Sequence, residues 1–170
     1  GLMTAAYAVP ISSKRKNLRN IYGIKIGIIA IVWAGVTVGL PVIGEGSADI
    51  ALRYVVLESL QRFFMVAVLI IPFDIRDFRS DDATLGTLPQ IIVVKQSKIV
   101  GGILLGACTL IEWIQNPGLS ESFLIFIIIA ITIAGMVRHS MVKQSPYFAS
   151  FWVEGIPIGW ALFLYGSDLL

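Results

Sequence analysis

The sequence predicts an all-α integral membrane protein, and two observations carry that prediction. Of the 170 residues, 56% are hydrophobic and only 14% are charged, whereas soluble domains usually carry about 25% charged residues. The charge deficit is concentrated in long apolar runs that proline and glycine separate, as in a bundle of membrane helices. We therefore expect residues 1–170 to form a single transmembrane helical domain.

Five apolar stretches are predicted to be membrane helices, and most are close to the roughly 20 residues that a bilayer crossing needs. They are Ile24–Leu40, Leu52–Phe73, Ile99–Ile114, Ser122–Val137 and Phe148–Tyr165. Prolines are expected to break the chain between them, at Pro41, Pro72, Pro89, Pro117 and Pro146. In the third stretch, small residues at near-helical spacing would let a neighbouring helix approach closely. These small residues are Gly101, Gly102 and Gly106.

The chain starts with an apolar segment that is too short to span a bilayer and ends at Pro10. No basic segment precedes it, as a signal peptide would require. We expect this segment to be the end of a helix whose start is missing. On this interpretation the chain is the C-terminal part of a longer protein. Its expected partner is the missing N-terminal half of the same protein.

The basic residues are segregated to one side of the predicted bundle. Eleven of the thirteen Lys and Arg residues lie before or at the start of the first span, or in and beside the second and fourth connections: Lys14, Arg15, Lys16, Arg19, Lys25, Arg76, Arg79, Lys95, Lys98, Arg138 and Lys143. The positive-inside rule places this side in the cytoplasm. We expect a bacterial cytoplasmic membrane, with the second connection on its cytoplasmic side.

The second connection contains an acidic run, from Asp74 to Asp82, between apolar spans. Asp74, Asp77 and Asp81 are spaced i, i+3, i+7 and would lie within roughly 60° of one another on a helix. Three carboxylates so close repel one another unless a cation lies between them. Oxygen ligands suit Mg²⁺, above all when a phosphate shares the metal. The sequence therefore predicts a magnesium site.

Basic residues near the acidic run would neutralise a bound diphosphate. The candidates are Arg76, Arg79, Lys95 and Lys98. The alternative interpretation is a solvated, charged loop in which the two arginines pair with the aspartates.

The pattern D-x-x-D-x-x-x-D from Asp74 to Asp81, followed by Gly86-Thr87-Leu88-Pro89, resembles the second aspartate motif of the UbiA superfamily of membrane prenyltransferases. The likeness is greatest to the branch that makes menaquinone and tocopherol precursors. The resemblance implies a nine-helix fold, of which this chain matches the end of helix four through helix nine. Asp82 and Gly86 stand where family members often carry basic residues.

The resemblance also implies a function. Asp74, Asp77 and Asp81 would bind Mg²⁺, and Asp77 would be catalytic. The Mg²⁺ would hold an isoprenyl diphosphate whose isoprenyl group is transferred to a lipophilic, aromatic acceptor in the membrane, as in quinone biosynthesis. Membrane lipids would surround the protein, and nucleic acid is not expected as a partner.

A second function from a different class stays open. The chain would then be a non-catalytic scaffold with a UbiA-like fold, or a subunit of a membrane complex, that binds a quinone or another isoprenoid lipid. The altered basic positions favour the scaffold, and the three aligned carboxylates favour the enzyme.

Three ionisable residues lie inside predicted spans, where charge is costly and usually has a partner. Glu58 and Arg62 are four residues apart in the second span, so they either neutralise each other or line a cavity. Glu154 lies in the last span without a partner in its own helix and is a further cavity candidate.

Overall fold

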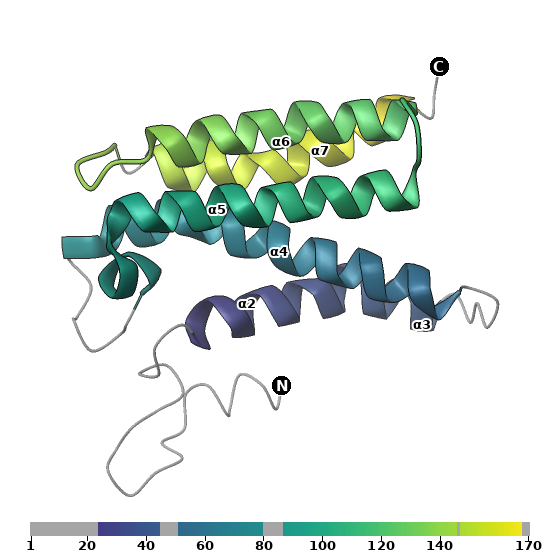
Figure 1. Ribbon diagram of the computed structural model, residues 1–170, viewed down its shortest axis with the longest axis horizontal. Helices are drawn as coiled ribbons and strands as arrows, with labels where there is room; N and C mark the ends of the chain where they lie inside the picture. Colours follow the sequence, from purple (N-terminus) through teal and green to yellow (C-terminus); the bar gives the residue numbers. More distant parts are fainter. Residues whose placement is uncertain (1–23, 45–50, 80–86, 146, 168–170) are drawn as a thin grey trace, which may run out of the picture.

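A computed structural model describes residues 24–44, 51–79, 87–145 and 147–167, and within these ranges the chain forms helices joined by short turns, with no strand. The helices run up and down in one bundle (Figure 1). In chain order they are α2 (Ile24–Ala34), a π-helical turn (Gly35–Gly39), α3 (Leu40–Gly44), α4 (Leu52–Arg76), a 3₁₀ turn (Asp77–Arg79), α5 (Leu88–Gln115), α6 (Glu121–His139), a second π-helical turn (Phe148–Val153) and α7 (Glu154–Ser167).

Each predicted apolar stretch forms a helix, and four helices are long and apolar enough to cross a membrane. These are Ile26–Gly44, Leu52–Arg76, Leu88–Gln115 and Glu121–His139. The apolar segment Phe148–Phe163 is also helical but shorter. The prediction of an all-helical chain with membrane-long helices is therefore confirmed within the described residues.

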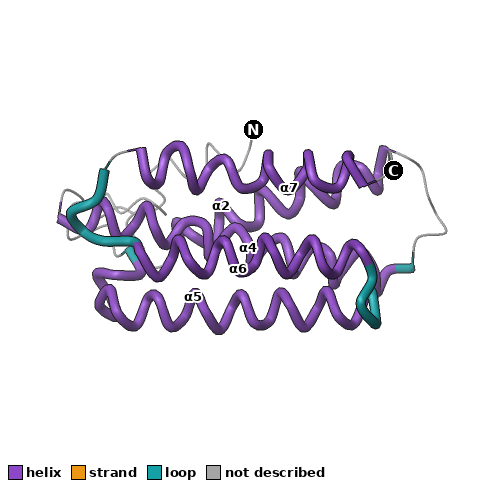
Figure 2. The backbone as a smooth tube through the Cα atoms, turned by 90° about the horizontal axis from the view of Figure 1, so that it is seen from above, coloured by secondary structure: helices purple, strands orange, loops and turns teal. Residues whose placement is uncertain are grey.

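The fourth helix is the centre of the bundle, because α4 packs against α2, α5 and α6. Figure 2 shows from a second direction that the helices lie side by side with their axes roughly aligned. The buried core lies mainly between α4, α5 and α6, and no single helix could bury these side chains alone. Its largest members include Val68, Ile71, Ile75, Cys108, Phe126 and Ile133.

Two predicted breaks are wrong, because the helices continue through Pro41 and Pro72. Proline lacks the N–H that would donate to the carbonyl four residues earlier. Just before Pro41, the backbone N–H of Leu40 donates to the carbonyl of Gly35, five residues back, and this π-type turn accommodates the proline. Apolar helices tolerate proline where neighbouring helices pack around it. As a result α4 ends at Arg76, beyond the predicted end at Phe73.

The third helix begins at Leu88, eleven residues before the predicted start at Ile99. Its first turn is capped by the side chain of Gln90, whose Oε1 accepts a hydrogen bond of 3.0 Å from the backbone N–H of Thr87. Val93 then breaks the regular helix with φ of 66° and ψ of 150°. A β-branched residue rarely adopts this conformation, so Val93 marks a strained kink between the first turn and the rest of α5.

The glycines of α5 differ in their contacts. A Cβ on Gly101 would lie 3.0 Å from Cδ1 of Ile71 and 3.4 Å from Cγ1 of Val137, whereas a Cβ on Gly102 or Gly106 would meet nothing within 4 Å. Gly101 is therefore the residue that allows α4, α5 and α6 to approach one another.

Candidate functional site: an apolar cavity with a charged residue pair at each end

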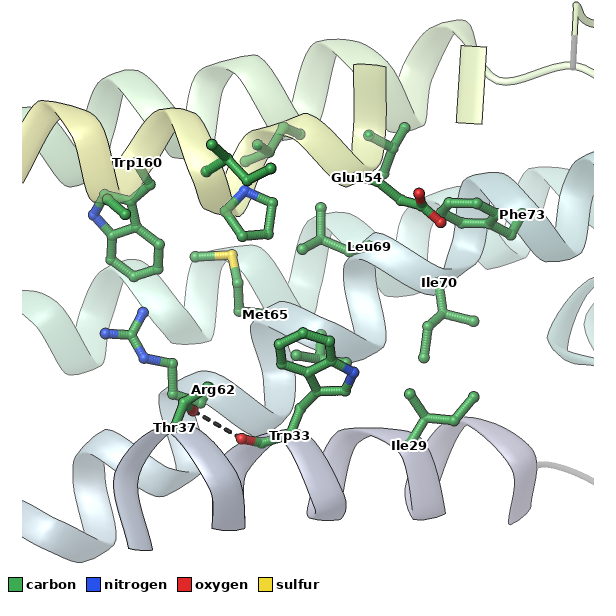
Figure 3. Close-up of a pocket in the computed structure, with 16 residues that line it drawn as sticks. Ile29, Trp33, Thr37, Arg62, Met65, Leu69, Ile70, Phe73, Glu154 and Trp160 are labelled. Carbon is green, nitrogen blue, oxygen red and sulfur yellow. Dashed lines mark hydrogen bonds between the residues drawn. The ribbon is translucent and has the colours of Figure 1, made fainter. Parts of the chain in front are cut away.

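An apolar cavity of about 720 Å³ lies between α2, α4 and α7. Its wall consists mostly of aliphatic and aromatic side chains, and Figure 3 shows Trp33, Met65 and Leu69 directed into it. Arg62 and Trp160 lie toward one end, and Phe73 and Glu154 lie toward the other (Figure 3). Two of the predicted cavity residues, Arg62 and Glu154, are thus among the lining residues.

One end of the cavity adjoins the first part of the acidic run. Phe73 is the last residue of α4 that lines the cavity, and its carbonyl accepts a hydrogen bond from the backbone N–H of Asp77, one helical turn further on. Arg76 lies beside both, because its guanidinium is 5.5 Å from the centre of the Phe73 ring. It also donates to the Asp77 carboxylate through Nε at 2.6 Å and Nη2 at 2.9 Å. We call Phe73, Arg76 and Asp77 the acidic end of the cavity.

The structure describes two of the three predicted metal ligands, Asp74 and Asp77, and these two differ in burial. Asp74 is fully buried, on the side of α4 that carries the core residues Ile71 and Ile75, and it does not line the cavity. The side chain of Asp77 is 30% exposed. The α-helix ends before Asp77, so the geometry assumed for the acidic run does not hold throughout it. Asp81 lies outside the described residues.

The described ranges contain no group of three or more metal-ligating side chains. Asp77 carries a partly exposed carboxylate at the acidic end, and such oxygen atoms fit a hard divalent cation such as Mg²⁺.

The predicted diphosphate ligands are divided between two places. Arg76 lies at the acidic end, and Arg79 closes the 3₁₀ turn that follows it. Lys95 and Lys98 instead line a separate groove between α5 and α6, which shares no lining residue with the apolar cavity. We call it the basic groove. Arg76 thus contacts Asp77 directly, whereas Lys95 and Lys98 line the basic groove.

The opposite end of the cavity carries a second ion pair. Nη2 of Arg62 is 2.8 Å from Oε1 of Glu58. The two residues therefore neutralise each other, which was one of the two roles predicted from their i, i+4 spacing. The guanidinium of Arg62 also lies 4.1 Å from the centre of the Trp160 ring, a cation–π contact that links α4 to α7. Arg62 therefore fills both roles that its position left open: it pairs with Glu58 and it lines the cavity.

A polar network between α4 and α5 was missed by sequence reasoning. Nε2 of Gln61, which is 1% exposed, donates to Oε2 of Glu112 at 2.8 Å, and Nδ2 of Asn116 donates to Oε1 of the same carboxylate at 2.9 Å. Glu112 is itself only 7% exposed. The spacing offered a signal, because Cys108 and Glu112 are four residues apart and therefore share one face of α5, the face on which Cys108 is buried.

Within the described residues, the structure thus defines a helical protein with four membrane-long helices, an apolar cavity between α2, α4 and α7, and an ion pair near each end of that cavity. A comparison with known protein families, with curated proteins and with solved structures found no match for this chain.

Proposed function

We propose that this protein is an integral membrane prenyltransferase, which transfers an isoprenyl group from an isoprenyl diphosphate to a lipophilic, aromatic acceptor. The observation that supports this proposal is the position of the acidic end: Arg76 and Asp77 lie one helical turn beyond Phe73, where the apolar wall on α4 stops. An isoprenyl diphosphate would match this order, because its apolar chain would lie along the wall and its charged diphosphate would lie at the acidic end. The bacterial cytoplasmic membrane is the proposed location, with the acidic end on the cytoplasmic side.

The charged head would be bound by the residues of the acidic end. Asp77 is the proposed magnesium ligand, and Asp74 and Asp81 would complete the ligand set, as the resemblance to the UbiA superfamily implies. Mg²⁺, when bound, stabilises the negative charge that develops on a departing diphosphate. Arg76 would exchange its carboxylate partner for a diphosphate oxygen, to which a guanidinium can donate two parallel hydrogen bonds. Arg79 is proposed as a second donor.

The apolar wall would hold the isoprenyl chain. Met65 and Leu69 carry the chain-binding surface on α4, and Trp33 faces them from α2 (Figure 3). Such a wall excludes water from the carbon at which cationic character develops, which prevents hydrolysis of the isoprenyl group.

Asp77→Asn tests the catalytic assignment. The variant should be made in the full-length gene product, because the resemblance to the UbiA superfamily implies another aspartate motif on preceding helices, and residues 1–170 alone are expected to be inactive. Mg²⁺-dependent incorporation of labelled farnesyl diphosphate into the lipid extract is expected to fall about 100-fold or more, since charge stabilisation at the leaving group is lost. The amount of membrane-inserted protein should not change.

Glu121→Gln is the control for this experiment. Glu121 is an exposed acid at the start of α6, at the end of the bundle opposite to Asp77 (Figure 1). Its neutralisation should leave the incorporation unchanged. Full incorporation by the Asp77→Asn protein would remove the catalytic role of Asp77.

The second candidate function is a non-catalytic scaffold or complex subunit that binds a quinone or another isoprenoid lipid in the cavity. It is favoured by the two-point ion pair between Arg76 and Asp77 and by the full burial of Asp74, because carboxylates held within the protein do not require a metal. A scaffold should bind a tritiated isoprenoid quinone without Mg²⁺. Leu69→Trp, which fills the cavity, should block this binding, whereas Asp77→Asn should leave it unchanged.

A further inference from the structure

The basic groove between α5 and α6 has a volume of about 390 Å³. The two helices lie side by side along its length (Figures 1 and 2), and α4 contributes only Val68 to its wall. Three cationic side chains line the groove at the end where α6 finishes: Lys95, Lys98 and Arg138. The rest of the wall is apolar or glycine, so that the groove has one charged end and one apolar end.

Among the described residues, no acidic side chain balances the charged end. None of them that is acidic lines the groove, and none forms an ion pair with Lys95, Lys98 or Arg138. The ammonium group of Lys98 donates a hydrogen bond of 2.7 Å to the backbone carbonyl of Arg138. This bond holds the ammonium group at the end of α6 and leaves two of its three N–H groups for a ligand.

The charged and apolar residues follow one another along a single face of α5. Lys95, Ile99 and Gly102 are spaced i, i+4, i+7, and Leu105 continues the same stripe. The distance from Lys95 to Leu105 along the helix axis is about 15 Å. If α5 crosses a bilayer, the cations lie toward the membrane surface and the apolar part of the groove lies among the acyl chains.

We propose that the basic groove binds an anionic phospholipid, with the phosphate against Lys95, Lys98 and Arg138 and one acyl chain along Gly102, Leu105 and Ala134. Basic pockets between membrane helices on the cytoplasmic side suit anionic head groups. The cations would repel the positive group of a zwitterionic head. The apolar continuation of the groove selects a lipid over a free phosphate, because only a lipid has a chain to fill it.

Native mass spectrometry of the detergent-purified protein tests the charged end. The probe is an equimolar mixture of phosphatidylglycerol and phosphatidylcholine with identical acyl chains. The protein should retain phosphatidylglycerol preferentially, and Arg138→Gln or Lys95→Gln should each lower this preference about fivefold. Lys143→Gln is the matched control, because Lys143 is an exposed cation in the turn after α6 that does not line the groove. Equal retention of the two lipids, or an equal loss in the Lys143→Gln protein, would overturn the proposal.

Gly102→Leu tests the apolar end without changing any charge. The added side chain meets no atom within 4 Å at its Cβ, so the helix can accept it while the groove is filled. Retention of phosphatidylglycerol should fall at least several-fold, and millimolar inorganic phosphate should not displace the lipid from the unmodified protein. Undiminished retention in the Gly102→Leu protein would show that no acyl chain enters the groove. Displacement by inorganic phosphate would assign the site to a free anion.

Discussion

Glu112 is a buried carboxylate between two membrane-long helices, where an unsatisfied polar group is costly. Both of its oxygens accept hydrogen bonds, one from Gln61 on α4 and one from Asn116, the residue that follows the end of α5. The bond to Gln61 joins the two helices, and the amide of Gln61 has as its other acceptor only the carbonyl of Cys108, at 3.4 Å. The hydrogen bond between Gln61 and Glu112 therefore stabilises the association of α4 with α5 and also satisfies a buried carboxylate.

Glu112→Leu should lower the free energy of unfolding in mixed detergent micelles by about 1–2 kcal/mol, because the buried amide of Gln61 loses its best acceptor. The double variant Gln61→Leu/Glu112→Leu should recover part of this loss, since neither polar group then remains. Glu121→Leu, at an exposed position, should change the free energy by less than about 0.5 kcal/mol. A double variant as unstable as the sum of the two single variants would contradict an interaction between Gln61 and Glu112.

At the scale of the helices, close packing depends on which residue of α5 faces α4. Gly101 faces Ile71 and Val137, whereas its neighbour Gly102 faces open space on the groove side. Two adjacent glycines thus serve different purposes: one allows contact between helices, and the other leaves a groove unfilled.

Gly101→Leu should lower the free energy of unfolding by about 1–3 kcal/mol, because the new side chain must displace Ile71 and Val137 from the core. The same substitution at Gly102 should leave the stability unchanged or slightly increase it, since leucine is a better helix former than glycine. Unfolding of the two variants in the same detergent mixture measures the difference. Equal losses at both positions would show that Gly101 does not face the core.

At the scale of the whole molecule, the bundle gathers basic residues from three helices at one end. The contacts of Lys98 with the end of α6, and of Gln144 with the carbonyl of Pro72, show that the end of α4, the first half of α5 and the end of α6 meet there. The remaining basic residues that were predicted on this side, from Lys14 to Arg19, lie outside the described residues. On the basis of the positive-inside rule, we propose that this end faces the cytoplasm.

Cysteine labelling measures this orientation. In a Cys108→Ala background, Leu119→Cys and Lys143→Cys place one exposed thiol in each of the turns before and after α6. A membrane-impermeant maleimide should label the cysteine at position 119 in intact cells, and should label the cysteine at position 143 only after permeabilisation. The reverse pattern would place the acidic end outside the cytoplasm and would remove Mg²⁺ and diphosphate from the proposed function.

Much of the fold was predictable from the sequence, because hydropathy is a local property. Each of the five predicted apolar stretches forms a helix. Helix ends were less predictable. Pro72 suggested an end that the packing around α4 overrides, and Thr87 with Gln90 starts a helix where a loop was expected.

The sequence by itself determined that this chain is helical, apolar and charged mainly at one end, since composition and order along the chain are sufficient for those properties. Only the tertiary structure decided that Asp74 is buried while Asp77 is partly exposed, that Gln61 bonds to Glu112, and that Lys95 and Lys98 line a groove of their own. The physical reason is that burial and pairing depend on which face of each helix is covered by a neighbour, and the neighbours of α4 and α5 are far away in the sequence.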